Sequence, residues 1–183
     1  MEADKLSRVL HLDTEWKLNS QLLKEALTVL ETQPTVDLFA SKTNAQFPLY
    51  VSYLPDPGAY AVDTFSLHWG DLTLYCFPPF SILPQVLRKI REERVTGIVV
   101  APQWKNQAFW PTLMNMLTAR PVPLSAREEL LSQPCNENLK HPRRKQLALL
   151  ICKVSGTDSE VKDFLRCNRV CHVILARIHS TNV

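Results

Sequence analysis

The chain has 183 residues, of which 45% are hydrophobic, and it carries a formal net charge of +3 at pH 7. That length suits one domain of ordinary size, and the hydrophobic content is high enough to bury a core, which excludes a globally disordered chain. The weak basic excess permits contact with nucleic acid without arguing for it.

The first part of the chain predicts one helix and two strands. Apolar residues recur at three- and four-residue steps over Thr14–Thr32, which indicates an amphipathic helix. The short run Thr35–Ser41 predicts a buried strand that stops before a polar turn. Phe47–Gly70 contains three prolines and many aromatic residues, so we expect an irregular loop packed over the sheet edge. A second strand is predicted at Asp71–Phe77, where the next two residues are prolines and end it.

Helix, strand and helix are then predicted in turn, at Ser81–Arg94, Thr96–Pro102 and Asn106–Leu117. This alternation predicts an α/β fold with a Rossmann-like, mostly parallel sheet flanked by helices. Residues 121–183 are expected to form a linker and an irregular C-terminal extension. Within that extension "LALLICKVSG" suits a strand or a helix, Asp158–Cys167 suits a helix, and "VCHVILARI" suits a strand.

Glycine and cysteine usage excludes several kinds of site. The four glycines stand far apart, which excludes a glycine-rich phosphate loop or a standard dinucleotide fingerprint. The five cysteines form no disulfide framework, and the run Cys167–His172 lacks a second ligand pair at zinc spacing, so we expect reduced thiols and no metal site. With no signal peptide and no apolar run that could span a bilayer, we expect an intracellular protein, cytoplasmic or nuclear, without a membrane partner.

A series of short motifs between Val36 and Leu117 resembles a known family. The motifs are "VDLFASKTNAQFPLYVS", "AVDTFSLHW", "LTLYCFPPFSIL" and "GIVVAPQW". Their order resembles the segment downstream of reverse transcriptase and RNase H in DIRS-like retroelement polyproteins, which in turn resembles phage-type DNA adenine (Dam-like) methyltransferases. In that family an Asp-x-x-Ala-Ser strand end is followed by Asn-Ala, a Tyr, an acidic-Trp segment and Asn-Pro-Pro-Tyr. The corresponding residues here are Asp37, Ala40, Ser41, Asn44, Ala45, Tyr50, Trp69 and Phe77 to Phe80.

The opening "EADKLSR" resembles the end of many retroelement RNase H domains. The resemblance implies that the RNase H catalytic carboxylates lie upstream of Met1, and that neighbouring polyprotein domains are partners. It also divides the chain. Residues 1–34 would be an RNase H tail remnant and a leading helix, residues 35–120 a Dam-like methyltransferase-type α/β domain, and residues 121–183 a linker and a C-terminal α/β extension.

The turn Phe77-Pro78-Pro79-Phe80 corresponds to the catalytic turn of the family. In these enzymes an Asn or Asp oxygen and the first proline's carbonyl accept hydrogen bonds from the adenine amine, and the closing aromatic ring stacks on the flipped base. Phe77 offers no acceptor, and losing such a group costs on the order of a hundred- to a thousandfold in rate. We therefore expect a degenerate motif that performs no methyl transfer and needs no cofactor. S-adenosylmethionine is expected only if an unusual acceptor keeps the chain active.

The resemblance implies a cofactor-binding set of Asp37, Phe39, Ser41 and Asn44. Asp37 would orient the cofactor at a strand end, and Phe39 would pack on its adenine. The alternatives are that Asp37 caps the turn that follows it and that Phe39 belongs to the core.

Two groups of residues in the sequence are of the kinds that bind nucleic acid. The cations Lys140, Arg143, Arg144 and Lys145 form the densest basic cluster and predict salt-dependent phosphate contacts, although a solvated linker has the same composition. Trp104 and Trp110 suit a platform on which bases stack, or else close the core over the sheet edge.

We therefore expect a retroelement-derived methyltransferase-like domain that is catalytically inactive and retains nucleic-acid or partner binding. An active DNA adenine methyltransferase, and a structural spacer between RNase H and a downstream recombinase, stay open as alternatives. For the fold, we expect Val36–Ala40, Leu72–Phe77 and Gly97–Ala101 to run parallel in one sheet, with Asp37 or Ser41 near Pro78.

Overall fold

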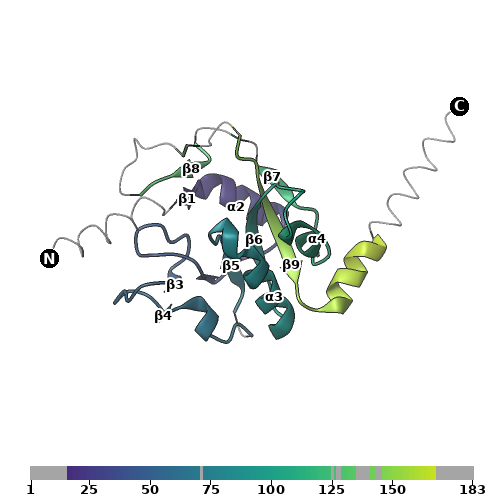
Figure 1. The fold of residues 1–183 in the computed structure, drawn as a ribbon, viewed down its shortest axis with the longest axis horizontal. Helices are drawn as coiled ribbons and strands as arrows, with labels where there is room; N and C mark the ends of the chain where they lie inside the picture. The colour runs from purple at the N-terminus through teal and green to yellow at the C-terminus, as the bar shows by residue number, and fades with distance from the viewer. Residues whose placement is uncertain are drawn as a thin grey trace, which may run out of the picture.

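The computed structural model describes residues 16–70, 72–124, 126, 129–134, 141–142 and 146–167. In this described part, a sheet of seven strands runs through the centre in the order β4-β3-β2-β5-β6-β9-β7 (Figure 1). Its strands are β2 (Val36–Asp37), β3 (Leu49–Ser52), β4 (Ala61–Val62), β5 (Leu74–Cys76), β6 (Thr96–Pro102), β7 (Val122–Leu124) and β9 (Leu149–Ser155).

Most neighbouring strands of the sheet are parallel. β2 pairs in parallel with β3 and with β5, β5 pairs in parallel with β6, and β3 pairs in parallel with β4. The predicted parallel arrangement of the three motif-bearing strands is therefore confirmed. β9 pairs antiparallel with β6 over its whole length and antiparallel with β7 on its other side. The segment that suited a strand or a helix is thus a strand, because neighbours on both sides bury its apolar run.

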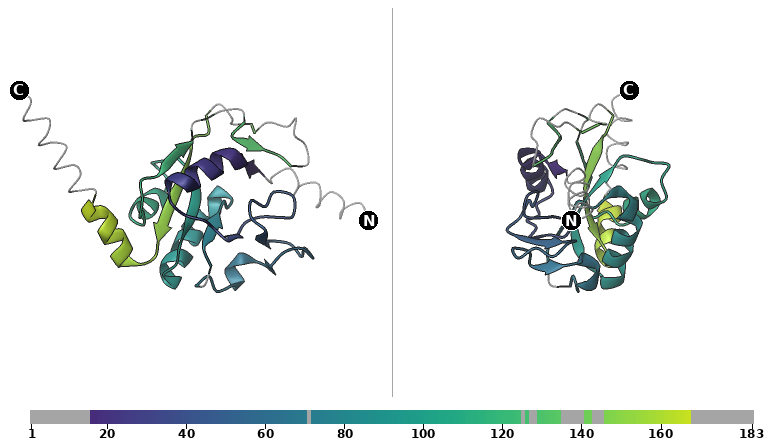
Figure 2. Two further views of the ribbon diagram at one scale, coloured as in Figure 1. Left: turned by 180° about the vertical axis from the view of Figure 1, so that it is seen from behind. Right: turned by 60° about the vertical axis from the view of Figure 1, so that its left-hand side comes forward.

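Helices cover both faces of the sheet. α2 (Ser20–Val29) packs on one face, and α3 (Leu83–Glu93) and α4 (Phe109–Met114) pack on the other, as the right-hand view of Figure 2 shows. The α2 face buries Tyr75, Ile98 and Ile151, whereas the α3 face buries Leu74 and Val99. Consecutive strand residues therefore point to opposite faces, and both sides of the sheet are core. The fold is α/β and Rossmann-like in its general plan.

Several predicted boundaries differ from the structure for local reasons. The first helix begins at Ser20 rather than Thr14, because β1 (Lys17–Leu18) pairs antiparallel with β8 (Leu131–Ser132) and Asn19 then caps the helix. β2 ends at Asp37 because the carboxylate of Asp37 accepts the Phe39 N–H and starts a turn. α4 is shorter than predicted, since Leu117 bridges to β9.

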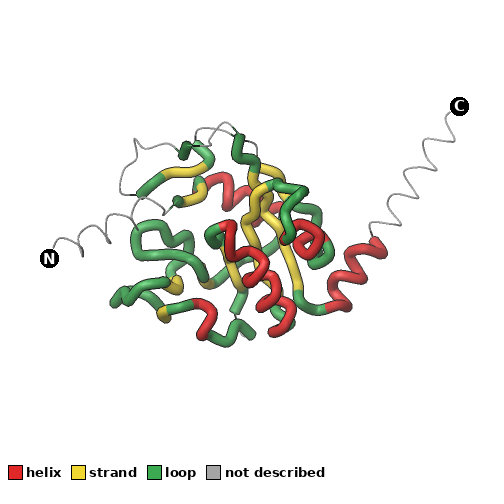
Figure 3. The backbone as a smooth tube through the Cα atoms, in the orientation of Figure 1, coloured by secondary structure: helices red, strands yellow, loops and turns green. Residues whose placement is uncertain are grey.

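The predicted loop at Phe47–Gly70 is wrong in part. It contains β3, β4 and the 3-10 helix η1 (Thr64–Ser66), while the remainder is loop, as Figure 3 shows at the β3–β4 end of the sheet. The prolines obscured two strands that are only four and two residues long. The α-helix predicted at Ser81–Arg94 is present as α3, preceded by the 3-10 helix η2 (Phe80–Ile82).

The end of the chain is described only in part. Residues 158–167 are helical, as predicted, and the strand predicted at "VCHVILARI" lies outside the described residues. None of the helices in the described ranges is long and apolar enough to cross a membrane.

Candidate functional site at the carboxyl edge of the sheet

The strand order places a topological switch point between β2 and β5. From β2 the chain proceeds outward to β3 and β4, and from β5 it proceeds the other way to β6. In open α/β sheets ligands bind outside the carboxyl ends of the strands at such a point. Asp37 ends β2, and Phe77 and Pro78 follow β5, so the structure brings these predicted site residues to the two sides of the switch point.

Asp37 is buried, with 3% of its surface exposed. Its Oδ1 accepts the Phe39 N–H at 3.3 Å and its Oδ2 accepts the Gln46 N–H at 3.1 Å. Burial raises the pKa of Asp37 to about 6, against the opposing effect of these two hydrogen bonds and of the Lys17 charge. Both carboxylate oxygens are thus engaged by the loop that follows β2, as the turn-capping interpretation expects.

The raised pKa of Asp37 predicts a pH effect on stability. Its ordinary pKa is 3.8, so between pH 3.8 and about 6 the folded state binds the proton that the unfolded state has released. Stability attributable to Asp37 therefore falls as pH rises through this window, by about 3 kcal/mol in total. Asp37→Asn lacks this titrating group. When the pH is lowered from 7 to 4.5, the free energy of unfolding of the wild type should therefore rise relative to that of the variant. Urea denaturation at the two pH values measures this, and a difference independent of pH would contradict it.

The loop after β2 is also held by hydrogen bonds of its own. Asn44 Oδ1 accepts the Ser41 N–H at 2.7 Å, and Asp56 Oδ2 accepts the Lys42 N–H at 3.2 Å and the Tyr50 hydroxyl at 2.9 Å. The hydrogen bond from the Gly58 N–H, followed by the one from Tyr50, lowers the pKa of Asp56. Ser41 and Asn44 therefore shape this loop. Asp56 holds the loop to β3, a role that the sequence did not reveal because the partners meet only in the folded chain.

Phe39 lies among other aromatic residues. Its ring centroid is 5.9 Å from that of Phe65 in an edge-on arrangement, and Phe65 lies 6.3 Å from Trp69. Phe39 also packs against the core on the α3 face. This packing is what the core interpretation of Phe39 expects.

The turn after β5 forms an aromatic cluster with Trp104. Pro78 is buried, the rings of Phe77 and Phe80 are 6.3 Å apart, and Trp104 meets Phe80 edge-on at 5.2 Å. Trp104 follows β6, so the carboxyl ends of two neighbouring strands supply this cluster. Beside it is an open hollow of about 410 Å³, lined by Phe80, Ser81, Pro84, Trp104, Gln107, Ala108 and Phe109. Sequence reasoning assigned Phe80 and Trp104 to separate roles and did not place them together.

The α2 side of the switch point is filled by the chain's own side chains. The Phe47 ring lies 5.3 Å from the Tyr75 ring, and Tyr75 is fully buried with a hydroxyl that has no hydrogen-bond partner among the described residues. The segment before Phe47 is fastened to the N-terminal strand: Lys17 Nζ donates to the Ala45 carbonyl at 3.1 Å, and the Gln46 side chain donates to the Leu18 carbonyl. These contacts join segments that are far apart in the sequence, so no local sequence motif predicts them.

The remaining predicted residues lie elsewhere. Lys140 and Arg143 to Lys145 are outside the described residues, although the neighbouring His141 stacks edge-on against Trp16 at 4.7 Å. Trp110 packs half-buried against the core on the α3 face and does not line the hollow.

The two buried cysteines of the described residues supply no reactive thiol at this edge. Burial raises the pKa of Cys76 and Cys152, the latter to about 12, which keeps both thiols protonated and unreactive. Across the ranges that the structure describes, no three metal-ligating side chains cluster.

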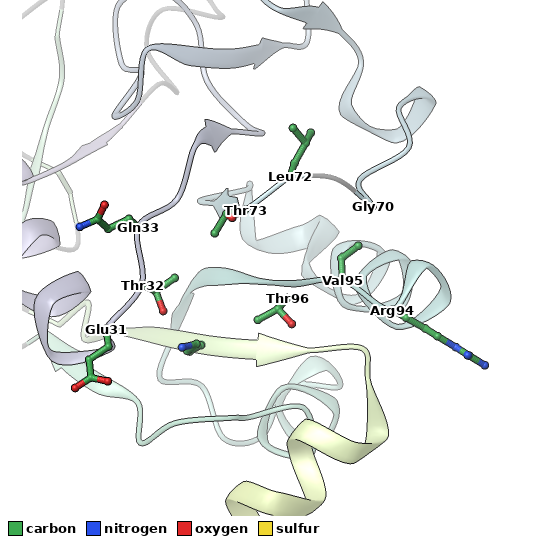
Figure 4. Close-up of a pocket in the computed structure, with 10 residues that line it drawn as sticks. Glu31, Thr32, Gln33, Gly70, Leu72, Thr73, Arg94, Val95 and Thr96 are labelled. Atoms are coloured by element: carbon green, nitrogen blue, oxygen red, sulfur yellow. The ribbon is translucent and has the colours of Figure 1, made fainter.

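A second hollow lies at the opposite, amino edge of the sheet (Figure 4). Its volume is about 460 Å³, and it is lined by Glu31, Thr32, Gln33, Gly70, Leu72, Thr73, Arg94, Val95, Thr96 and Lys153. Lys153 Nζ donates a hydrogen bond to the Leu30 carbonyl at 3.3 Å and so caps the C-terminal end of α2. Neither hollow is lined by Asp37, Ser41 or Asn44.

Comparisons with known proteins assign no family. No model of a protein family matches the chain, and no curated protein matches it.

Proposed function

We propose that this chain is a retroelement-derived, methyltransferase-like domain that has lost methyl transfer and acts by binding nucleic acid or a protein partner. The strand order supports the methyltransferase-like part. The sheet follows the doubly wound order, with the antiparallel strand β9 inserted between its last two parallel strands. This order fits the Rossmann-like, mostly parallel sheet that the resemblance implies, and the degenerate turn follows the strand on one side of its switch point.

The observation that carries the loss of activity is Phe77 at the end of β5. Its half-buried ring packs toward the α2-side core and Phe80, and it offers no atom that could accept a hydrogen bond from an adenine amine. Of the two acceptors that the family uses, only the carbonyl of Pro78 would be left. A site built this way can hold an aromatic group but cannot orient the amine for attack.

The residues present do not suit S-adenosylmethionine either. The carboxylate of Asp37 already accepts two backbone N–H groups, and Phe39 packs on Phe65. Phe47, fastened through Ala45 and Gln46, fills the α2 side of the switch point. The Phe47 ring would have to leave Tyr75 for the cofactor to enter on the α2 side, so we propose that the chain does not bind it.

Methyl transfer is expected to be undetectable. The purified chain is incubated with labelled S-adenosylmethionine and with duplex or single-stranded DNA, and label in the DNA is counted. We expect no label above a heat-inactivated control, and no heat in a calorimetric titration with the cofactor or its demethylated product. Label that survives removal of contaminating methylases and is lost in Pro78→Ala would establish the active enzyme instead.

The binding part of the proposal has two sources of support. The basic cluster of Lys140, Arg143, Arg144 and Lys145 favours phosphate contacts on composition. The aromatic cluster of Phe77, Phe80 and Trp104 favours a ligand with flat, apolar faces. Neighbouring polyprotein domains are the partners that the retroelement resemblance suggests.

A further inference from the structure

The hollow beside Phe80 and Trp104 has an uncharged lining. Two segments form it: residues 80–84, which lead into α3, and residues 104–109, which lead into α4. Phe80, Pro84, Trp104 and Phe109 supply apolar surface, while Ser81 and Gln107 supply the polar side chains. A ligand held by its phosphates would need cations in the lining, and none of the described residues that line the hollow is charged. The lining therefore favours a neutral ligand.

The polar side chains of this hollow have no hydrogen-bond partner in the part of the chain that the structure describes. Within the described ranges, the Trp104 indole N–H, the Gln107 amide and the Ser81 hydroxyl make no hydrogen bond to the protein, and Ser81 and Gln107 are exposed. Trp104 itself is held in place, because its backbone N–H donates to the Pro102 carbonyl at 2.8 Å and Phe80 packs edge-on against its ring. The hollow thus presents fixed aromatic walls with free donors beside them.

We propose that this hollow is a docking site for a proline-rich segment of a partner protein, bound in the polyproline II conformation. A polyproline II segment has no internal hydrogen bonds, so its carbonyls need donors, and its rings pack into aromatic-lined grooves. The indole N–H of Trp104 and the amide of Gln107 supply the donors, and Phe80, Pro84 and Phe109 supply the walls. The proposal rests on the proposed function only in that the domain binds a partner.

The competing occupant is an unpaired nucleobase, which also stacks on aromatic rings. Proteins that bind single-stranded nucleic acid by stacking its bases on aromatic rings also carry a positively charged groove that follows the nucleic-acid backbone. The absence of any cation in this lining favours the peptide. The experiment therefore includes both ligands.

The test follows the indole N–H signals of the full chain by ¹H–¹⁵N NMR, with Trp104→Phe used to assign the Trp104 signal. Acetylated decaproline is titrated in, with a glycine-serine decapeptide and a ten-residue oligothymidylate as comparisons. We expect decaproline alone to shift the Trp104 signal. Trp104→Ala should weaken binding about tenfold or more, as a buried aromatic anchor does. Gln107→Ala should weaken it by about three- to tenfold, the value of one hydrogen bond.

Gln103→Ala is the matched control. Gln103 is an exposed glutamine of the same connection that does not line the hollow, so its loss should leave the affinity unchanged. Decaproline that leaves the Trp104 signal unmoved, or that binds Trp104→Ala as well as wild type, would overturn the proposal. Oligothymidylate that shifts the signal and displaces decaproline would assign the hollow to nucleic acid. Methyl transfer detected alongside decaproline binding would remove the proposed loss of activity and leave this docking site standing.

Discussion

Replacing Trp69 by alanine is expected to lower the free energy of unfolding by about 3–5 kcal/mol, the cost of deleting a large buried ring. Trp69 is 0% exposed, and its indole N–H donates to the carbonyl of Thr64 at 2.9 Å. The Lys89 ammonium lies 5.1 Å from the ring centroid. The substitution would leave a cavity, and the Thr64 carbonyl would keep only the longer hydrogen bond from the Leu67 N–H, at 3.4 Å. Because a domain of this size is stabilised by only about 5–15 kcal/mol, much of that stability would be lost.

Urea denaturation followed by circular dichroism measures this loss. Trp69→Phe keeps most of the ring and removes only the N–H donor, so about 1–2 kcal/mol is expected. Tyr53→Ala is the matched control, because Tyr53 is an aromatic residue of the β3–β4 connection that is 79% exposed, and its loss should cost less than about 0.5 kcal/mol. Equal stability of Trp69→Ala and Tyr53→Ala would show that Trp69 does not anchor this region.

Gly156→Ala should cost about 3 kcal/mol, at the upper end of the usual range for overpacking. Gly156 follows β9, and its N–H donates to the Val95 carbonyl at 2.9 Å. A Cβ at this position would overlap the carbonyl oxygen of Ile90 and stand 2.9 Å from the Cα of Arg91. Both atoms belong to the backbone at the end of α3, so no side-chain rotation relieves the clash.

Gly70→Ala separates this backbone clash from a general intolerance of added methyl groups. A Cβ at Gly70 would meet the imidazole Nε2 of His68 at 2.6 Å, but the His68 side chain is 75% exposed and can rotate away. We expect a cost below about 1 kcal/mol, again by urea denaturation. A cost for Gly156→Ala as small as that for Gly70→Ala would mean that the end of α3 shifts readily.

The sequence predicted the parts of the fold that have a local pattern. The continuous apolar run Thr96–Pro102 became β6 with its predicted bounds, and the amphipathic stretch after the two prolines became α3. The pair β1 and β8 could not be predicted, because two-residue strands have no periodicity. β9 was ambiguous between helix and strand because a fully buried strand and a buried helix share a continuous apolar run.

Residues of the candidate site were found one at a time and without their partners. Asp37 and Phe80 were identified from motif positions. The hydrogen bond from Gln46 to Asp37 and the contact of Trp104 with Phe80 depend on segments that only folding brings together. Asp56 was missed for the same reason, since two of its partners, Lys42 and Tyr50, belong to different segments. A sequence motif can predict which side chain stands at the end of a strand, but the tertiary fold determines which residues that side chain contacts.

The position of β9 has a consequence for how the protein is made. Among the described strands of the sheet, β9 is the last to leave the ribosome, yet it lies between β6 and β7 and pairs along the whole length of β6. Until residue 155 has emerged, the nascent chain carries a seven-residue apolar strand, β6, with one edge unpaired. Such an edge invites pairing with other chains. Translation that stops before β9 should therefore yield a product that aggregates, rather than a smaller folded domain.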